Sequence, residues 1–472
     1  MNTLRMLDHQ VEQLNSLLFS RTDVESAAYL RCAVVQHGND ITFLVRDVIP
    51  VADQHYLIRE RDRLSIASDS FIPVLKHVRG RDEAFVFIHT HPDGLRAFSR
   101  QDNREEERLF ATVRRRASGR PHVSIVFTDR ASFAGRVHLS NGGTAPLDRI
   151  VTIGARFRIH FGDPDETPIS LIFDRQVRAF GPDIQRVLRH LRVAIVGGGG
   201  TGSAVFEQCL RLGVGEILVI DHDLFDVTNV NRVYNSRRTD AGKPKIDIME
   251  RTAADADLPT VIRTIRGSIN DPAVARELVW ADVIFGCTDK ELPRAILCRL
   301  ATRYLIPLFD LGVVVASTDG VLKGVTGRVT TVFPGTACLM CRERISPAMI
   351  RAESLPPGER KRLATEGYAP ELGITNPAVI PFTTGVAAQA VSELLHRLTG
   401  FMGARASSET LIQFDVPQIR SNATPAEPWC DCANTATWGR GDEMPLLGMA
   451  WPESTDEPVS DTDDAAISAK KR

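Results

Sequence analysis

Two histidines, a serine and an aspartate have a spacing that could hold a catalytic metal ion. They are His89, His91, Ser99 and Asp102, and an apolar run that begins at Ala84 precedes them. Side chains alternate between the two faces of a strand, so the two imidazoles point to the same side. A turn can then bring the carboxylate of Asp102 to the same point. Three protein ligands leave a tetrahedral Zn²⁺ one open position, which is typical of catalytic zinc sites.

The same residues also allow a structural interpretation. Ser99 could cap a helix over Arg100–Arg116, with Asp102 in its first turn. A His-x-His pair without the other two residues would favour this interpretation. The complete string, His-x-His-x₇-Ser-x₂-Asp, favours a metal site.

This string resembles the signature of the JAMM (JAB/MPN) metallopeptidase family, which includes zinc isopeptidases that cut after the C-terminal glycine of ubiquitin-like proteins. The resemblance implies a mixed sheet flanked by helices. It also implies a catalytic Zn²⁺ on His89, His91 and Asp102, and an oxyanion stabilised by Ser99. The family requires an upstream glutamate as general base, and we assign this role to Glu25.

Glu25 is expected at the start of a helix that precedes a strand over residues 31–36. Its carboxylate would take a proton from water and later pass it to the leaving amine. Glu60 also precedes the histidines and is the alternative base.

A glycine-rich loop follows a short apolar strand that begins at Val193. Its glycines are Gly197, Gly199, Gly200 and Gly202, and an apolar-periodic helix over residues 203–212 follows. Glycines let the backbone approach phosphates closely, and a helix N-terminus favours negative charge. The next strand, Glu216–Ile220, ends at Asp221, where a carboxylate can hold a ribose hydroxyl. The pattern predicts a nucleotide site, and an NAD-dependent dehydrogenase would share it up to this point.

Polar residues further along the chain distinguish ATP from a dinucleotide. They are Asp223, Asn229, Arg232, Lys245, Asp289 and Arg294, the last two after a strand expected over residues 282–285. Two cations and a late acidic residue suit a triphosphate with Mg²⁺. A nicotinamide would need a hydride pocket instead.

This series resembles the ThiF/MoeB and ubiquitin-activating (E1-like) adenylyltransferase family, which adenylates the C-terminal carboxylate of ubiquitin-fold proteins on a doubly wound, Rossmann-like sheet. The resemblance implies that these residues bind ATP and Mg²⁺. Asp221 would bind the ribose, Asp289 would bind Mg²⁺, and the phosphates would be bound by Asn229, Arg232 and Lys245, with Asp223 beside them. Lys290 stands where the family usually has asparagine. Arg175 matches an arginine that reaches into the neighbouring subunit's ATP site, so we expect a homodimer.

Four cysteines resemble the structural zinc site of the same family. They are Cys338, Cys341, Cys430 and Cys432, and the second pair has one intervening residue where the relatives have two. Relatives that form a thioester carry a cysteine in the loop that corresponds to residues 373–382, and this chain has none there. The resemblance therefore supports adenylation and gives no support to a loop thioester.

The length of 472 residues suggests several domains. We expect a JAB/MPN domain over residues 1–147, with a hinge near 140–147, a linker over 148–170, an adenylation domain over 171–435 and a disordered acidic tail over 440–472. The net charge of −2 gives no sign of the positive charge that is typical of nucleic-acid-binding proteins. No signal peptide or membrane span is apparent, and the scattered cysteines suit a reducing compartment, so we expect a cytoplasmic protein.

The fold class is thus α/β in both halves, and the predicted function is bifunctional. A zinc peptidase would cut after a C-terminal glycine, and an Mg·ATP-dependent enzyme would adenylate the Gly-Gly carboxylate of the same ubiquitin-like partner. A bacterial conjugation pathway with a conjugating enzyme, for instance in antiphage defence, and activation of a sulfur-carrier protein by a sulfur donor both fit. An NAD-dependent oxidoreductase and a non-catalytic scaffold are the weaker alternatives.

Overall fold

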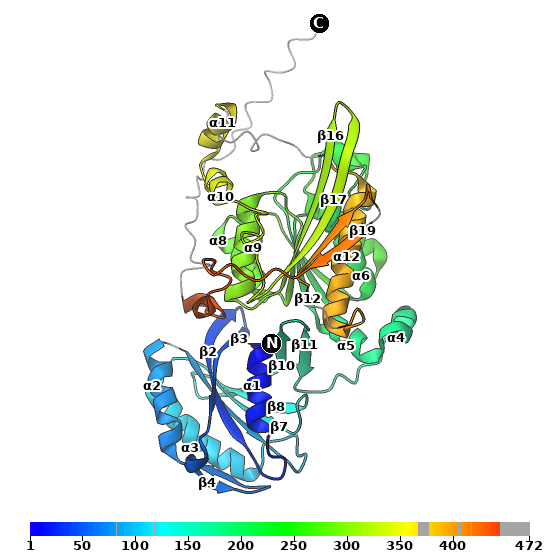
Figure 1. Ribbon diagram of the computed structural model, residues 1–472. Helices are drawn as coiled ribbons and strands as arrows, with labels where there is room; N and C mark the ends of the chain where they lie inside the picture. Colours follow the sequence, from blue (N-terminus) through cyan, green and yellow to red (C-terminus); the bar gives the residue numbers. More distant parts are fainter. Residues whose placement is uncertain (82, 118, 367–376, 404–406, 417, 444–472) are drawn as a thin grey trace.

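The computed structural model describes residues 1–81, 83–117, 119–366, 377–403, 407–416 and 418–443, and its framework is two large sheets (Figure 1). Among these residues, no helix has the length and apolar character needed to cross a bilayer.

The first sheet has nine strands in the order β11-β10-β1-β3-β2-β6-β7-β8-β9. Their bounds are β1 (Asn2–Leu7), β2 (Ala27–His37), β3 (Asp40–Pro50), β6 (Ala84–Thr90), β7 (His122–Phe127), β8 (Phe133–His138), β9 (Thr144–Pro146), β10 (Arg149–Ile153) and β11 (Arg158–Phe161). The sheet is mixed, because β1 runs parallel to β3 and β10 and β6 runs parallel to β7. A small hairpin of β4 (Tyr56–Arg59) and β5 (Leu64–Ile66) lies beside it.

Helices cover both faces of this sheet. Leu14 and Leu18 of α1 (Asp8–Leu18) belong to the core on one face. On the other face, α2 (Ile72–Arg81) and α3 (Arg100–Arg116) contribute Leu75 and Phe110 to a second core. The expected mixed sheet with flanking helices is therefore present in the first half of the chain.

The expected boundary of the first half is wrong. Asn141 and Gly142 do not form a hinge, because they close the hairpin between β8 and β9. Residues 148–170 are not a free linker either, because they contain β10 and β11, and β10 pairs with β1 from the other end of the unit. The first sheet thus continues to Phe161.

The second sheet has eight strands in the order β14-β13-β12-β15-β16-β17-β18-β19. Their bounds are β12 (Arg192–Val196), β13 (Glu216–Ile220), β14 (Val261–Ile265), β15 (Val283–Gly286), β16 (Leu308–Thr318), β17 (Val321–Val332), β18 (Glu409–Gln413) and β19 (Gln418–Asn422). The strands from β14 to β16 are parallel, and β17 to β19 extend the sheet in antiparallel fashion. This is the expected doubly wound, Rossmann-like arrangement.

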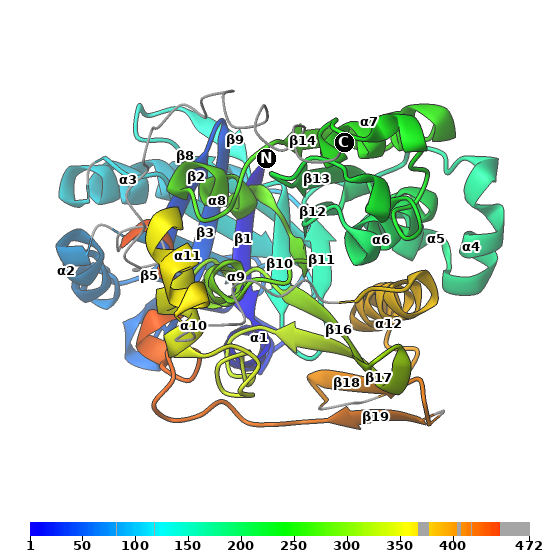
Figure 2. The ribbon, with the colours of Figure 1, turned by 90° about the horizontal axis from the view of Figure 1, so that it is seen from above.

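The helices of the second half are α4 (Asp174–Phe180), α5 (Pro182–His190), α6 (Gly200–Leu212), α7 (Lys245–Ala256), α8 (Pro272–Glu277), α9 (Glu291–Arg303), α10 (Pro347–Glu353), α11 (Pro357–Thr365) and α12 (Ile380–Thr399). Figure 2 shows α6, α7 and α12 on one side of the sheet and α9 and α10 on the other.

The two halves share one apolar core. Val35 of β2 and Val151 of β10 belong to the same buried cluster as Val193 of β12 and Tyr304. A buried ion pair also crosses between the halves: Arg149 donates to both carboxylate oxygens of Asp282, at 2.8 and 2.6 Å. The halves are therefore packed as one body.

The expected tail begins too early. Gly441 is buried, and the carboxylate of Asp442 accepts hydrogen bonds from Arg276 at 2.5 and 2.7 Å and from Tyr304 at 2.8 Å. Residues 440–443 are therefore packed against the fold, and 444–472 lie outside the described residues.

Candidate functional site

The carboxyl ends of β12 and β15 meet where the strand order of the second sheet reverses. Such switch points are where doubly wound sheets bind ligands. β12 leads into the glycine loop, and β15 leads into Cys287, Thr288 and Asp289. The topology therefore places two of the predicted motifs on either side of one crevice.

Close packing explains two of the loop glycines. Gly197 has φ +99°, and a Cβ there would lie 2.6 Å from the carbonyl oxygen of Cys287. A Cβ on Gly202 would overlap the carbonyl oxygen of Gly197. Gly199 has no neighbour within 4 Å of such a Cβ, so its backbone is open to a ligand. The α6 helix that follows begins at Gly200.

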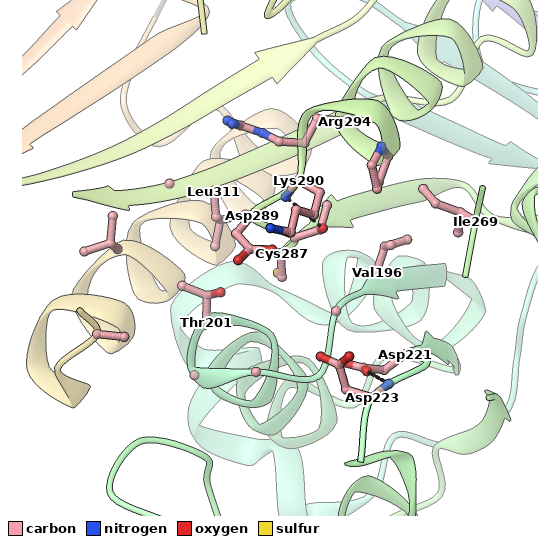
Figure 3. A pocket seen from close by; sticks show the side chains of 18 of the residues that line it. Val196, Thr201, Asp221, Asp223, Ile269, Cys287, Asp289, Lys290, Arg294 and Leu311 are labelled. Carbon is pink, nitrogen blue, oxygen red and sulfur yellow. Dashed lines mark hydrogen bonds between the residues drawn. The ribbon is translucent and has the colours of Figure 1, made fainter. Parts of the chain in front are cut away.

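A cavity of about 1240 Å³ opens in front of this loop. The predicted residues that line it are Gly197, Gly199, Gly200, Asp221, Asp223, Arg232, Lys245 and Asp289. Figure 3 shows Asp221 and Asp223 on one side of Asp289 and Arg294 on the other. Residues nearly a hundred positions apart thus face one space.

Hydrogen bonds fix the carboxylates at one end of this cavity. Asp221 accepts from the backbone of Gly198 at 2.6 Å and of Asp223 at 2.7 Å. Lys245 donates to Asp223 at 2.6 Å. Partial burial opposes the ionised form, but this lysine lowers the pKa of Asp223 below its usual value.

The remaining charged groups are less constrained. Arg232 donates from Nη1 to the carbonyl oxygen of Thr228 at 2.8 Å. Asp289 is exposed and forms no hydrogen bond or ion pair with other described residues, so its carboxylate is available to a metal ion. Lys290, where the resemblance led us to expect asparagine, lines the cavity next to it.

Three of the predicted residues lie away from the cavity lining. Gly202 is enclosed beneath the loop, and Asn229 is buried in the short helix Val227–Asn229, where its carbonyl oxygen accepts from Arg232 and Val233. Arg175 is exposed on α4, outside the cavity of its own chain.

The sequence reasoning missed most of the arginine-rich wall of the same cavity and singled out only Arg294 there. Arg294, Arg328, Arg344 and Arg360 line it, and Arg294 and Arg328 share the fully buried Asp310. The sequence did contain a signal for one of them, because Arg328 is an arginine inside the largely apolar strand β17. The loop expected over residues 373–382 lies partly outside the described residues, and its Pro377 and Ala378 line the cavity.

Comparison with known proteins assigns this half of the chain to a family. The model of the ThiF family matches residues 173–434, more than half of the chain. The chain belongs to the ThiF family. The match leaves residues 1–172 outside it.

Several curated proteins are similar to parts of the chain. The tRNA threonylcarbamoyladenosine dehydratase of Bacillus subtilis (strain 168) is 41% identical over 83 residues, 18% of this chain and 33% of that protein. Ubiquitin-like modifier-activating enzyme 5 of Drosophila willistoni is 25% identical over 242 residues, 48% of this chain and 53% of that protein. The SAMP-activating enzyme E1 of Haloferax volcanii is 25% identical over 161 residues, 34% of this chain and 56% of that protein. The chain thus spans about a third to about half of these relatives' lengths.

One solved structure is similar in outline. E. coli MccB with MccA-N7isoASN has 19% sequence identity and a TM-score of 0.46, over 56% of this chain and 76% of that chain. This likeness is too distant to add to the family assignment.

The ThiF domain also contains the expected cysteine cluster. Sγ of Cys338 lies 3.8 Å from that of Cys341 and 3.5 Å from that of Cys430, and Cys341 lies 3.4 Å from Cys432. All four sulfur atoms lie within 4.8 Å of one another, so this cluster could bind zinc despite the single residue within its second pair. Such a four-thiolate set would form a closed, structural site.

A second set of metal-type ligands lies outside the ThiF domain, at the end of β6. The Nε2 atoms of His89 and His91 are 3.2 Å apart, and each is 3.3 Å from an oxygen of Asp102. Nδ1 of His91 and the carbonyl oxygen of Leu95 are 2.9 Å apart. If Nδ1 carries the proton, Nε2 is left as a ligand atom. Ligand atoms of the three side chains lie within 4.8 Å of one another, so the residues present fit Zn²⁺.

Ser99 and Asp102 also satisfy the structural interpretation. Oγ of Ser99 accepts from the backbone of Asp102 at 3.1 Å, and Asp102 accepts from the backbone of Ser99 at 2.6 Å, which is a reciprocal cap on α3. Capping uses the serine oxygen as acceptor and leaves its hydroxyl proton available. The capping and metal interpretations are therefore compatible.

Glu25 and Glu60 differ in position. Glu25 is 4% exposed, and its Oε1 lies 3.9 Å from Nε2 of His91. Burial raises the pKa of Glu25 to about 8. Glu60 is exposed and contacts Glu25 only through the backbone, at 2.8 Å. The expected helix start at Glu25 is wrong, because Glu25 lies in a loop, two residues before β2 begins at Ala27.

Proposed function

We propose that the ThiF domain adenylates a protein carboxylate at the expense of ATP. The observation that carries this proposal is the convergence of the glycine loop, Asp221, Lys245 and Asp289 on one cavity at the switch point of the sheet. Asp221 would hold the ribose, and the open backbone at Gly199 would face the phosphates. Bound Mg²⁺, with Asp289 as its protein ligand, would offset phosphate charge.

In this reaction a carboxylate oxygen attacks the α-phosphorus of ATP, and the bond from that phosphorus to the departing pyrophosphate breaks. Arg232 and Lys245 would stabilise the negative charge on the phosphate oxygens. Little else is required of the protein, because phosphoryl chemistry depends mainly on positioning and charge.

The partner that we propose is a ubiquitin-like protein that ends in Gly-Gly. Two relatives are named as activating enzymes, one for a ubiquitin-like modifier and one for SAMP. A conjugating enzyme would then accept the acyl group, or a sulfur donor would convert it to a thiocarboxylate if the partner is a sulfur carrier. A homodimer in which Arg175 completes the neighbour's site is part of the same proposal.

The test is ATP–pyrophosphate exchange with a panel of Gly-Gly proteins. Exchange with at least one of them, and no binding of NAD by calorimetry, is expected. RNA belongs in the panel as well, because one relative is named for a tRNA nucleoside. NAD binding without exchange for any partner would refute the proposal.

We also propose a zinc-dependent peptidase activity for the first half of the chain. The family match does not extend over this half, so the proposal rests on the convergence of His89, His91, Asp102 and Glu25. A zinc ion at the three ligands would polarise the scissile carbonyl. Glu25 would take a proton from the attacking water and give it to the leaving amine, and Ser99 would donate to the oxyanion.

The test is cleavage of a fusion in which a ubiquitin-like protein ending in Gly-Gly is followed by a reporter. Chelation should stop cleavage. Glu25→Gln should retain zinc, because Glu25 is not among the three ligands, and should lower the rate by roughly 10²–10⁴-fold. Glu60→Gln is the matched control and should cleave normally. Loss of activity in Glu60→Gln with full activity in Glu25→Gln would refute the assignment.

A further inference from the structure

One of the residues that line the cavity of the ThiF domain is a buried arginine with an unused donor. Arg328 of β17 is 9% exposed and lines the cavity. Its Nη2 donates to Asp310 at 2.9 Å, whereas its Nη1 has no hydrogen-bond partner among the described residues. An unmet buried donor destabilises the fold by the loss of its hydration. A donor kept in this position is therefore suited to a ligand.

The surroundings of Arg328 are positively charged. Asp310 also accepts from Arg294, at 2.9 and 2.6 Å, so two guanidinium groups share one carboxylate. Arg344 lines the same cavity, and its charge acts on Arg328 too. Burial, despite Asp310, lowers the pKa of Arg328 to about 10, so the group remains charged at neutral pH. The cluster of Arg294, Arg328 and Asp310 carries a formal charge of +1 and favours an anion.

Gly312 makes room for the guanidinium. It lies directly opposite Arg328 in the pairing of β16 with β17. A Cβ at this position would lie only 2.7 Å from Nη2 of Arg328. The glycine therefore lets the guanidinium lie against β16, where Asp310 holds it in one orientation.

We propose that Arg328 binds the C-terminal carboxylate of the protein substrate and so selects chains with a free main-chain carboxylate. This inference rests on the adenylation activity proposed above. One carboxylate oxygen would accept the hydrogen of Nη1, and the other would attack the α-phosphorus. Guanidinium groups suit this task because their planar donors match a carboxylate.

Two observations favour a carboxylate over a phosphate of the nucleotide. Arg232 and Lys245 already provide cations for the phosphates. Figure 3 shows Asp289 between two groups: Asp221 and the glycine loop lie on one side of it, and Arg294 lies on the other. The cavity, at about 1240 Å³, also exceeds the range of about 300–1,000 Å³ that is usual for a small-molecule site. It therefore has space for a peptide tail beside ATP.

The experiment measures binding of acetyl-Ala-Ala-Gly-Gly to the full chain, in its free-acid and C-terminally amidated forms, by ligand-observed NMR with AMP present. The acid should bind about ten-fold more tightly than the amide, since a hydrogen bond to a charged group is lost with the amide. Arg328→Gln should remove this preference and leave the affinity for Mg·ATP unchanged. In exchange assays the same variant should raise the KM for the protein substrate by about ten- to one-hundred-fold.

Three further variants separate the role of Arg328 from general effects. Arg328→Lys keeps the charge without the planar donors and should restore only part of the preference. Gly312→Ala keeps the arginine but displaces it, and should lose the preference too. Arg108→Gln makes the same change of charge on the exposed face of α3, far from the ThiF domain, and should change nothing.

The outcomes distinguish this inference from the proposed function. Absence of exchange with every Gly-Gly partner would refute adenylation. Equal binding of acid and amide by the unmodified protein, no binding of the acid, or an undiminished preference in Arg328→Gln would refute the role of Arg328, even where exchange is normal. Weaker binding of Mg·ATP to Arg328→Gln, with normal peptide binding, would assign Nη1 to a phosphate instead.

Discussion

Asp282 should be among the residues that contribute most to the stability of the whole chain. Its carboxylate accepts two hydrogen bonds from Arg149 and a third, at 3.1 Å, from the backbone of Arg192, and it lies 3.6 Å from Nη2 of Arg5. Asp282 belongs to the ThiF domain, whereas Arg5 and Arg149 are in strands of the first sheet. Asp282→Asn keeps the shape of the side chain and removes its charge.

The expected magnitude follows from burial. Arg5 and Arg149 have side chains 2% and 1% exposed, and burial lowers the pKa of Arg5 to about 10. Asp282→Asn leaves two buried guanidinium groups without a counter-charge, a change that typically costs about 3–5 kcal/mol. A domain is stable by only about 5–15 kcal/mol. The variant should therefore lose a large part of its free energy of unfolding.

The assay is urea unfolding followed by circular dichroism, together with native-state hydrogen exchange. In the unmodified chain, the amides of β1 and β12 should open with the same free energy, because both strands border one shared core. In Asp282→Asn that free energy should fall for both strands together. Asp183→Asn is the control, because the Asp183 side chain is 92% exposed and, within the described part of the chain, pairs only with Arg186. A loss below about 1 kcal/mol, within the range of surface ion pairs, or a loss confined to one sheet, would refute the reasoning.

Three further predictions concern the metals and the assembly. Elemental analysis should find two zinc ions per chain, and Cys341→Ser should lower the count to one. The same variant should lower the melting temperature, because the four-cysteine cluster joins segments some ninety residues apart. An unchanged zinc count would contradict the closed site. Asp289→Ala should abolish ATP–pyrophosphate exchange while fusion cleavage continues, since Asp289 and His89 are in different halves of the chain; loss of both activities would indicate misfolding. Mixing the inactive Asp289→Ala with Arg175→Ala should restore some exchange, because one site of each mixed dimer has both residues; no recovery after proven subunit exchange would exclude a composite site.

Local patterns in the sequence were sufficient to place the main elements. The helix over Arg100–Arg116 and the strand over Glu216–Ile220 have the predicted bounds. Capping residues and apolar periodicity are properties of short segments, so they can be read without the fold. The glycine loop and the residues after β15 line one cavity, as the switch-point rule for doubly wound sheets leads us to expect.

Long-range pairing could not be read in the same way. The turn at Asn141 and Gly142 looked like a domain boundary, yet the chain continues into β10, which pairs with β1 nearly 150 residues earlier. Arg328 was missed for a related reason. No residue near Arg328 in the sequence indicates that it pairs with Asp310, because the two side chains meet only when β16 pairs with β17. Asp442 likewise looked like part of an acidic tail until Arg276 and Tyr304 were seen to hold it.

The arrangement of the two candidate sites leads to a final prediction about the route of the substrate. Figure 1 shows β4, next to Glu25 and the histidines, at the end of the molecule opposite α11, whose Arg360 lines the cavity of the ThiF domain. The shared core and the buried Arg149–Asp282 pair prevent one half from swinging toward the other. A tail cut at the first site must therefore leave the protein before the second site adenylates it.

A dilution experiment tests this route. A labelled ubiquitin-like fusion is supplied with Mg·ATP and with an excess of the same partner, unlabelled and already cut. If the cut partner is released, the label in the adenylate should be diluted in proportion to the excess, and Glu25→Gln, which blocks cutting, should remove the label entirely. Label that stays undiluted would show direct transfer, and the sites would then have to meet across two copies of the chain rather than within one.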